Sequence, residues 1–345
     1  MKKIFVKLYS SLAFLILFSS CSKYLIGVEK TNTPANNFQV LWQDFDQHYG
    51  AFIPKNINWK EQYVKYNKMI SDTMSNSSLF NVLTKTLDVL DDNHVYLRPT
   101  QETGLPWYSG GILGRTSVED FDKKVSESYL KQKIVYNAAL EYGFYPDNIG
   151  YINVKDLGED IALYYKAMDD ILGKLNDTKG IVMELRENGG GEDRVSQYIA
   201  NRFASEKHFS FSSRLRNGPG HNDFGNPINF YMQPEGSFQY TKPVIMLTNL
   251  NVYSSGETLV LAMKQNNNVK MVGDLTGGAL SDAIERELPN GWVYRLPVAD
   301  VRDAKGKNLE GIGIQPDILI KNKKEDLQAG HDKALEKALE LLKSL

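Results

Sequence analysis

The sequence predicts an α/β fold, and two observations lead to it. From Asn148 onward, short apolar runs alternate with amphipathic helical patterns, as they do where helices cover a sheet. Before that point, residues 37–100 carry apolar side chains at helical spacing and predict a small helical N-terminal region. The chain has 345 residues, of which 42% are hydrophobic and 24% charged, so an ordinary globular protein with a real core is expected.

The N-terminal region is expected to hold three helices. Phe38, Leu41 and Phe45 lie on one face of the first helix, which starts near Asn37. The second and third helices are expected over 59–74 and 78–90. A turn around His94 then leads into a short strand, and residues 101–147, which lack a clear pattern, are expected to be connecting structure.

Residues 148–345 are expected to form the core. Its expected strands are 150–154, 180–185, 244–247, 269–272 and 292–296, and its expected helices are 160–175, 194–203, 255–265 and 332–345. Residues 207–236 are rich in Gly, Asn and Pro and are expected to be a long surface excursion.

The first residues are expected to be a targeting signal rather than part of the fold. Lysines near Met1 precede an apolar stretch over 8–18 that is too short to span a bilayer, and Cys21 follows two serines. This resembles a bacterial lipoprotein signal, although Phe18 stands where leucine is usual. We therefore expect a signal over 1–20, lipidation of Cys21 and a tether over 21–36. An ordinary secretory signal with an incidental cysteine is the alternative.

Charge and cysteine content exclude some classes of protein. The net charge is −2 and no basic stripe is present, so nucleic acid is not an expected partner. A single cysteine cannot form a disulfide within the chain, so packing must stabilise the fold. The expected location is the bacterial cell envelope, with the exported chain held at a membrane by its N-terminal lipid.

Two distant segments have the pattern of two halves of one active site. Residues 181–191 and 244–257 each read as a buried strand, a tight turn and a helix start, and the second turn holds Ser254. Backbone N–H groups of Gly190 or Gly191 and of Ser255 could hold a developing negative charge. This pairing suggests acyl transfer by a serine nucleophile.

Simpler interpretations of both segments remain open at this point. Ser254 and Glu257 fit a helix capping box, in which the two side chains bond to free N–H groups of the first turn. The glycines fit a plain tight turn, and no dinucleotide or P-loop motif accompanies them. His94, one of five histidines, could be an ordinary polar residue beside a strand.

Four motifs in order resemble the S41 serine peptidases, which include C-terminal processing proteases and tricorn-like proteases. The motifs are residues 180–191, 254–257, 273–278 and 310–317, and the resemblance covers roughly residues 38–342. It implies a crotonase-like (ClpP/crotonase) α/β core with flanking helices.

Within that family, the chain is more similar to the tricorn-like branch. C-terminal processing members place a lysine just after a Thr-x-Gly motif, where this chain has Ala279. Tricorn-like members use a histidine from an N-terminal segment and a downstream glutamate, which His94 and Glu310 match. Asn93 stands where a small hydroxyl residue is usual, and a PDZ domain is not expected.

The resemblance implies a serine endopeptidase acting on peptides or proteins in the cell envelope. His94 would be the base for Ser254, and Glu310, with Asn93, would orient the imidazole. Neither a metal nor an organic cofactor is implied, and the oligomeric state is left open. The alternatives are a non-catalytic carrier of apolar ligands or an envelope scaffold on the same fold, and a hydrolase of esters or thioesters.

Overall fold

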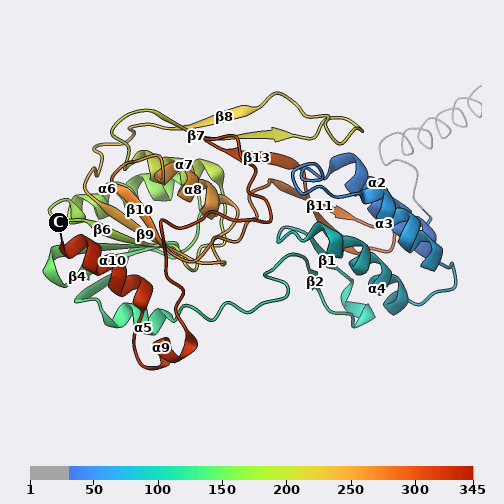
Figure 1. Ribbon diagram of the computed structural model, residues 1–345, viewed down its shortest axis with the longest axis horizontal. Coiled ribbons are helices and arrows are strands. Elements are labelled where there is room, and N and C mark those ends of the chain that lie inside the picture. The colour runs from blue at the N-terminus through green and yellow to red at the C-terminus, as the bar shows by residue number, and fades with distance from the viewer. Residues whose placement is uncertain (1–30, 345) are drawn as a thin grey trace, which may run out of the picture.

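The computed structural model describes residues 31–344, which form two lobes joined by long strands (Figure 1). The expected signal over 1–20, the lipidation site Cys21 and most of the tether lie outside the described residues. Within residues 31–344, every helix is too short or too polar to cross a bilayer.

The larger lobe is built on a seven-stranded sheet. Five strands are parallel, and β4 and β3 extend the sheet at one end as antiparallel strands. In sheet order the strands are β14 (Ile318–Leu319), β10 (Val269–Gly273), β9 (Val244–Thr248), β6 (Ile181–Glu184), β5 (Ile149–Val154), β4 (Leu140–Tyr145) and β3 (Gln132–Val135).

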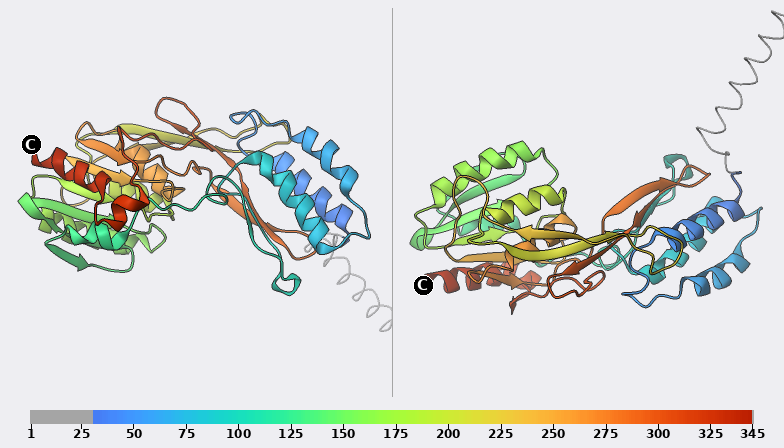
Figure 2. Two further views of the ribbon diagram at one scale, coloured as in Figure 1. Left: turned by 60° about the horizontal axis from the view of Figure 1, so that its bottom comes forward. Right: turned by 90° about the horizontal axis from the view of Figure 1, so that it is seen from above.

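Helices cover both faces of this sheet (Figure 2). On one face, Met183 and Met246 pack with α6 (Ile161–Leu175), α7 (Asp193–Asn201) and α8 (Ser255–Met263). On the other face, Val182 and Ile245 pack against α10 (Lys333–Lys343). Because neighbouring residues of a strand point to opposite faces, each central strand contributes to both cores, and its whole sequence is apolar.

The smaller lobe confirms the predicted helical N-terminal region. The helices α2 (Pro34–His48), α3 (Trp59–Tyr66) and α4 (Asn76–Leu87) pack together with the strands of a second sheet around a separate apolar core. That sheet has the order β11 (Ala283–Glu287), β12 (Val293–Pro297), β1 (Tyr96–Arg98) and β2 (Tyr108–Ser109). The second helix is shorter than expected, because the chain tightens into a 3₁₀ turn over Asn67–Met69.

Two segments expected to be irregular form strands instead. The excursion over 207–236 contains the hairpin of β7 (His208–Leu215) and β8 (Ile228–Met232), which pairs with β13 (Ala299–Asp303) in a third sheet. Phe211 and Phe230 stack with ring centres 4.4 Å apart and fix that hairpin. Part of 101–147 forms α5 (Lys123–Ser128), β3 and β4, and the last short helix is α9 (Lys324–Gln328).

Candidate active site

Ser254 occupies a strained turn between β9 and α8. Its backbone has φ 56° and ψ −133°, a region that residues with a side chain rarely adopt. The backbone N–H of Ser254 donates to the carbonyl of Ala279 at 2.7 Å and helps to hold this conformation. The strain places a half-buried hydroxyl at the mouth of a turn, as in the nucleophile turns of other hydrolases.

The capping-box interpretation of this turn is wrong. The Ser254 hydroxyl makes no bond to the helix N–H groups. The Glu257 carboxylate instead accepts hydrogen bonds from the Thr276 hydroxyl at 2.5 Å and from the N–H groups of Gly278 at 3.0 Å and Ala279 at 2.7 Å. Burial raises the pKa of Glu257 to about 7, although these donors stabilise the ionised form. Glu257 therefore fixes the loop that faces Ser254.

The glycine-rich loop after β6 lies directly against Ser254. A Cβ atom on Gly190 would lie 2.7 Å from the Cβ of Ser254, and Gly190 has φ 98°. Only glycine allows both the close approach and the backbone angle. The Asn188 side chain holds this loop, since its oxygen accepts from the Gly190 N–H at 2.9 Å and its nitrogen donates to the Val154 carbonyl at 2.8 Å.

Two backbone N–H groups beside Ser254 remain unused within residues 31–344. They belong to Gly191 and Ser255, whereas the N–H of Gly190 is already bonded to Asn188. The Ser255 hydroxyl donates to the Gly191 carbonyl at 2.9 Å and so ties the two turns together. Of the three donors predicted from the sequence, Gly191 and Ser255 are therefore available and Gly190 is not.

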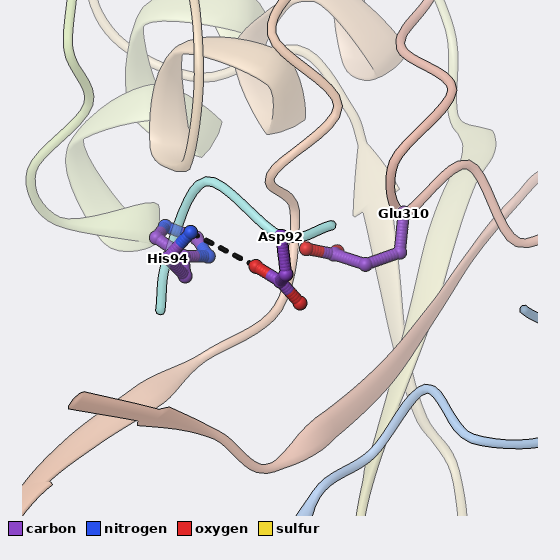
Figure 3. A group of neighbouring side chains, drawn as sticks. All are labelled: Asp92, His94 and Glu310. Carbon is purple, nitrogen blue, oxygen red and sulfur yellow. Dashed lines mark hydrogen bonds between the residues drawn. The ribbon is translucent and has the colours of Figure 1, made fainter. Parts of the chain in front are cut away.

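His94 is buried beside two carboxylates, at the start of β1. Asp92, His94 and Glu310 each offer an atom that lies within 4.8 Å of the others (Figure 3). The backbone N–H of His94 donates to Asp92 Oδ1 at 2.9 Å, and the Tyr49 hydroxyl donates to Asp92 Oδ2 at 2.7 Å. Neither ring nitrogen of His94 has a hydrogen-bond partner among the described residues.

Glu310 reaches the same place from the loop between β13 and β14. Its Oε2 accepts from the N–H groups of Leu280 and Ser281, each at 2.9 Å, while Oε1 has no partner within the described part of the chain. Leu280 and Ser281 directly follow Ala279, whose carbonyl accepts the hydrogen bond from the Ser254 N–H. The same short segment therefore contacts both Glu310 and Ser254. Buried polar atoms are usually paired, so unpaired ones in a single cluster point to a functional role.

The three groups also have shifted pKa values. Burial, followed by the positive charge of Arg295, lowers the pKa of His94 to about 3. Burial, followed by the negative charge of Asp92, raises the pKa of Glu310 well above its usual value. Burial also raises the pKa of Asp92. Two neighbouring buried carboxylates would repel each other, which costs free energy, so the pair favours a state that keeps one proton.

Asn93 lies beside this cluster but bonds elsewhere. Its side-chain nitrogen donates to the Gly277 carbonyl at 2.5 Å, and its oxygen accepts from the Leu113 N–H at 2.9 Å. Both polar atoms thus bind backbone groups of neighbouring loops, with no bond to His94 or Glu310. Asp92, for which no role was predicted, is the residue whose carboxylate lies close to both His94 and Glu310.

A cleft of about 280 Å³ opens at Ser254. Its walls come from the glycine loop, the start of α8 and the segment that enters β11, and they are mostly polar. Arg295 of β12 lines the cleft, and its guanidinium makes neither an ion pair nor a hydrogen bond with the side chains and backbone of residues 31–344. No sequence pattern singles out Arg295, because only the pairing of β12 with its neighbouring strands brings it to the cleft.

The Asp92, His94 and Glu310 side chains resemble a metal site in their spacing but not in their free ligand atoms. One imidazole and two carboxylates within 4.8 Å are ligands that a divalent cation accepts. However, three of the four carboxylate oxygens already accept N–H or O–H bonds from the protein. Only Glu310 Oε1 and the imidazole nitrogens are free of protein partners in the described chain, which is a poor ligand set for a structural metal.

Comparison with known proteins gives consistent matches. The sequence model of peptidase family S41 matches residues 148–320, half of the chain, and that of the tricorn protease C1 domain matches residues 31–88. The carboxy-terminal processing protease CtpA of Bacillus subtilis is 24% identical over 60% of this chain and 41% of its own length. The tricorn protease of Thermoplasma volcanium is 26% identical over 56% of this chain and 17% of its own length.

A solved structure covers more of the chain. A candidate peptidase from Parabacteroides merdae is 30% identical, has a TM-score of 0.81, and is matched over 90% of this chain and 97% of its own. The matches to the two curated relatives span less than half of either protein.

Proposed function

Because this chain belongs to peptidase family S41, we propose that it is a serine endopeptidase with Ser254 as nucleophile and His94 as general base. The substrate class is peptides or proteins, as for its peptidase relatives. The observation that carries the proposal is the strained Ser254, which lies beside two unused N–H groups within residues 31–344. A structural serine at a helix start would use its hydroxyl as a cap.

The proposed reaction begins with attack of Ser254 Oγ on the peptide carbonyl carbon. His94 takes the hydroxyl proton and then gives it to the leaving amine, and water hydrolyses the acyl-enzyme by the reverse proton path. The N–H groups of Gly191 and Ser255 hold the tetrahedral oxyanion, and losing one such donor costs about 10²–10³ in rate.

The carboxyl pair stabilises the imidazolium that forms in this step. With one proton retained by the pair, Asp92 and Glu310 together carry about one negative charge next to His94. That charge favours proton uptake by an imidazole whose pKa is otherwise depressed by burial. Glu310 keeps the role proposed from the sequence, and Asp92 takes the place proposed for Asn93.

The cellular setting is part of the same proposal. An envelope peptidase held by a lipid on Cys21 fits the signal pattern in the sequence, and a crotonase-like core fits the family. The carrier alternative has less support, because the cleft at Ser254 is lined mostly by polar groups and a carrier of apolar ligands needs an apolar cavity.

Labelling with a fluorophosphonate probe tests the proposal directly. Wild-type protein should be labelled, and Ser254→Ala and His94→Ala proteins should not. A folded wild type that resists labelling and cleaves no peptide would reject the proposal and favour the carrier. Activity that is lost in EDTA and restored by a divalent cation would instead assign Asp92, His94 and Glu310 to a metal.

A further inference from the structure

The strand β11 begins at the wall of the cleft. Leu280, Ser281, Asp282 and Ala283 line the cleft together with Ser254, and the chain then continues directly as β11. A molecule that leaves the cleft along this wall meets β11 first. The strand belongs to the sheet of the smaller lobe (Figure 1).

One edge of β11 is free. It lies at the end of its sheet, and within residues 31–344 only β12 pairs with it. Just outside the strand ends, Val298 N–H donates to Asp282, and Leu288 N–H donates to Trp292. Antiparallel pairs alternate between bonded and non-bonded positions, so the even-numbered residues of β11 face β12. The N–H and C=O groups of Ala283, Glu285 and Glu287 therefore point outward from the sheet.

The free edge is open to solvent. Ile284, Glu285, Arg286 and Glu287 all have exposed side chains, and no proline interrupts the strand. An edge strand with unpaired backbone groups is a template for an added strand. The charged side chains on β11 disfavour pairing with an apolar edge strand of another molecule, but they do not occupy the backbone N–H and C=O groups that a peptide would bond.

We propose that an extended segment of the substrate adds to the free edge of β11 as a further strand and runs from it into the cleft at Ser254. The inference rests on the proposed peptidase function and names the form of substrate it takes. The five residues of β11 reach about 13 Å from the cleft at 3.3 Å per residue. The preferred substrate is therefore an unfolded stretch with about four residues on one side of the scissile bond.

The charges on the edge predict a sequence preference. Glu285 and Glu287 lie two positions apart on the same face of the strand. The Glu285 carboxylate accepts a hydrogen bond from the Tyr96 hydroxyl, and neither carboxylate forms an ion pair with any residue from 31 to 344. A strand laid against them places alternate side chains opposite these carboxylates. Lysine or arginine at two alternate positions should raise kcat/KM a few-fold over glutamate at the same positions.

A proline at an outward position tests the proposal. Glu285→Pro removes one outward N–H but no bond to β12, and edge strands tolerate proline at such positions. Glu285→Ala is the matched control, because it also removes the side chain that bonds to Tyr96. For an unfolded ten-residue peptide without charged side chains, which does not use the Glu285 carboxylate, kcat/KM should fall about tenfold or more with proline and less than threefold with alanine. The rate of fluorophosphonate labelling should be the same in both.

Equal kcat/KM values for the two variants would overturn the inference, while labelling and cleavage by the wild type would still support the peptidase. If the proline variant does not fold, wild-type protein with singly N-methylated peptides gives the same test. Methylation should reduce kcat/KM about tenfold at every second position on one side of the scissile bond. A profile without this alternation would overturn the inference.

Discussion

Two buried charged clusters in this molecule differ in how completely they are bonded. The structural cluster joins Arg186 to Glu184 and Asp332, with four guanidinium bonds of 2.7–3.0 Å. The site cluster of Asp92, His94 and Glu310 leaves both imidazole nitrogens and one carboxylate oxygen without partners among residues 31–344. Both are almost fully buried, so exposure does not explain the difference.

The structural cluster connects the end of β6 to the start of α10. Asp332 accepts the Leu335 N–H as the cap of that helix, and Asn322 donates to the same carboxylate. A buried charge is tolerated when each partner is bonded in this way. Where burial comes without partners, as at His94, we propose that the unpaired ring nitrogens serve the reaction: His94 takes the proton of the Ser254 hydroxyl and passes it to the leaving amine of the substrate.

The largest expected effect is on catalysis. His94→Ala should lower kcat/KM about 10³-fold or more, because Ser254 loses its base, while the free energy of unfolding changes by less than about 2 kcal/mol. Ser254→Ala is the matched control and should give a similar loss of activity. Steady-state kinetics and urea unfolding of both proteins measure this, and full activity in His94→Ala would remove His94 from the mechanism.

The structural cluster should respond in the opposite way. Arg186→Met leaves Glu184 and Asp332 as buried charges without a partner, and should reduce the free energy of unfolding by about 3–5 kcal/mol. Lys166→Met breaks a solvent-exposed pair with Asp170, so its effect on the free energy of unfolding should be much smaller than that of Arg186→Met. Urea unfolding compares the two. An equal loss in the free energy of unfolding for the two variants would mean that burial does not make the Arg186 ion pairs more important than the exposed one.

Asp92→Asn tests whether the carboxyl pair acts as a unit. The substitution keeps the size of the side chain but removes a charge beside the imidazole, so kcat should fall about 10–100-fold. The neighbouring and more exposed Asp91 provides the control, since Asp91→Asn should change kcat less than threefold. An unchanged kcat in Asp92→Asn would leave Glu310 as the sole carboxylate of the site.

The smallest expected effect is on the pH dependence of stability. The pKa of His94 is about 3 in the folded protein and about 6.5 when unfolded, so the unfolded state binds more protons between these values. Stability should therefore fall as the pH falls from 6.5 toward 3. Over pH 6.5–5.5, His94→Asn should remove about 1 kcal/mol of this loss. Parallel curves for both proteins in urea unfolding would show that His94 is not buried in its neutral form.

The part of the site that the sequence predicted is the part encoded locally. Ser254, Gly191 and Ser255 each lie in a strand–turn–helix segment, whose apolar run and glycines are visible without knowledge of the fold. His94 and Glu310 could be singled out only through family motifs. Asp92 was missed, although it stands two positions before His94, because its role depends on Glu310 and Tyr49 from distant segments.

The fold shows the same division. The buried parallel strands and their helices were predicted closely, since each is a long apolar or amphipathic run. The strands β3, β7, β8 and β11 were missed, because they are short, partly exposed and stabilised by antiparallel partners rather than by their own patterns. Proposed substrate binding depends on one of these missed strands.

The site cluster has a consequence for the order in which the protein is made. Asp92 and His94 are synthesised before Ser254, whereas Glu310 is synthesised after it, and Asp332 of the structural cluster follows later still. A growing chain can therefore carry Ser254 without the carboxylate that would stabilise its base. On the proposed mechanism, a nascent chain, or one terminated between Ser254 and Glu310, is inert, and the peptidase becomes active only after Glu310 has been synthesised.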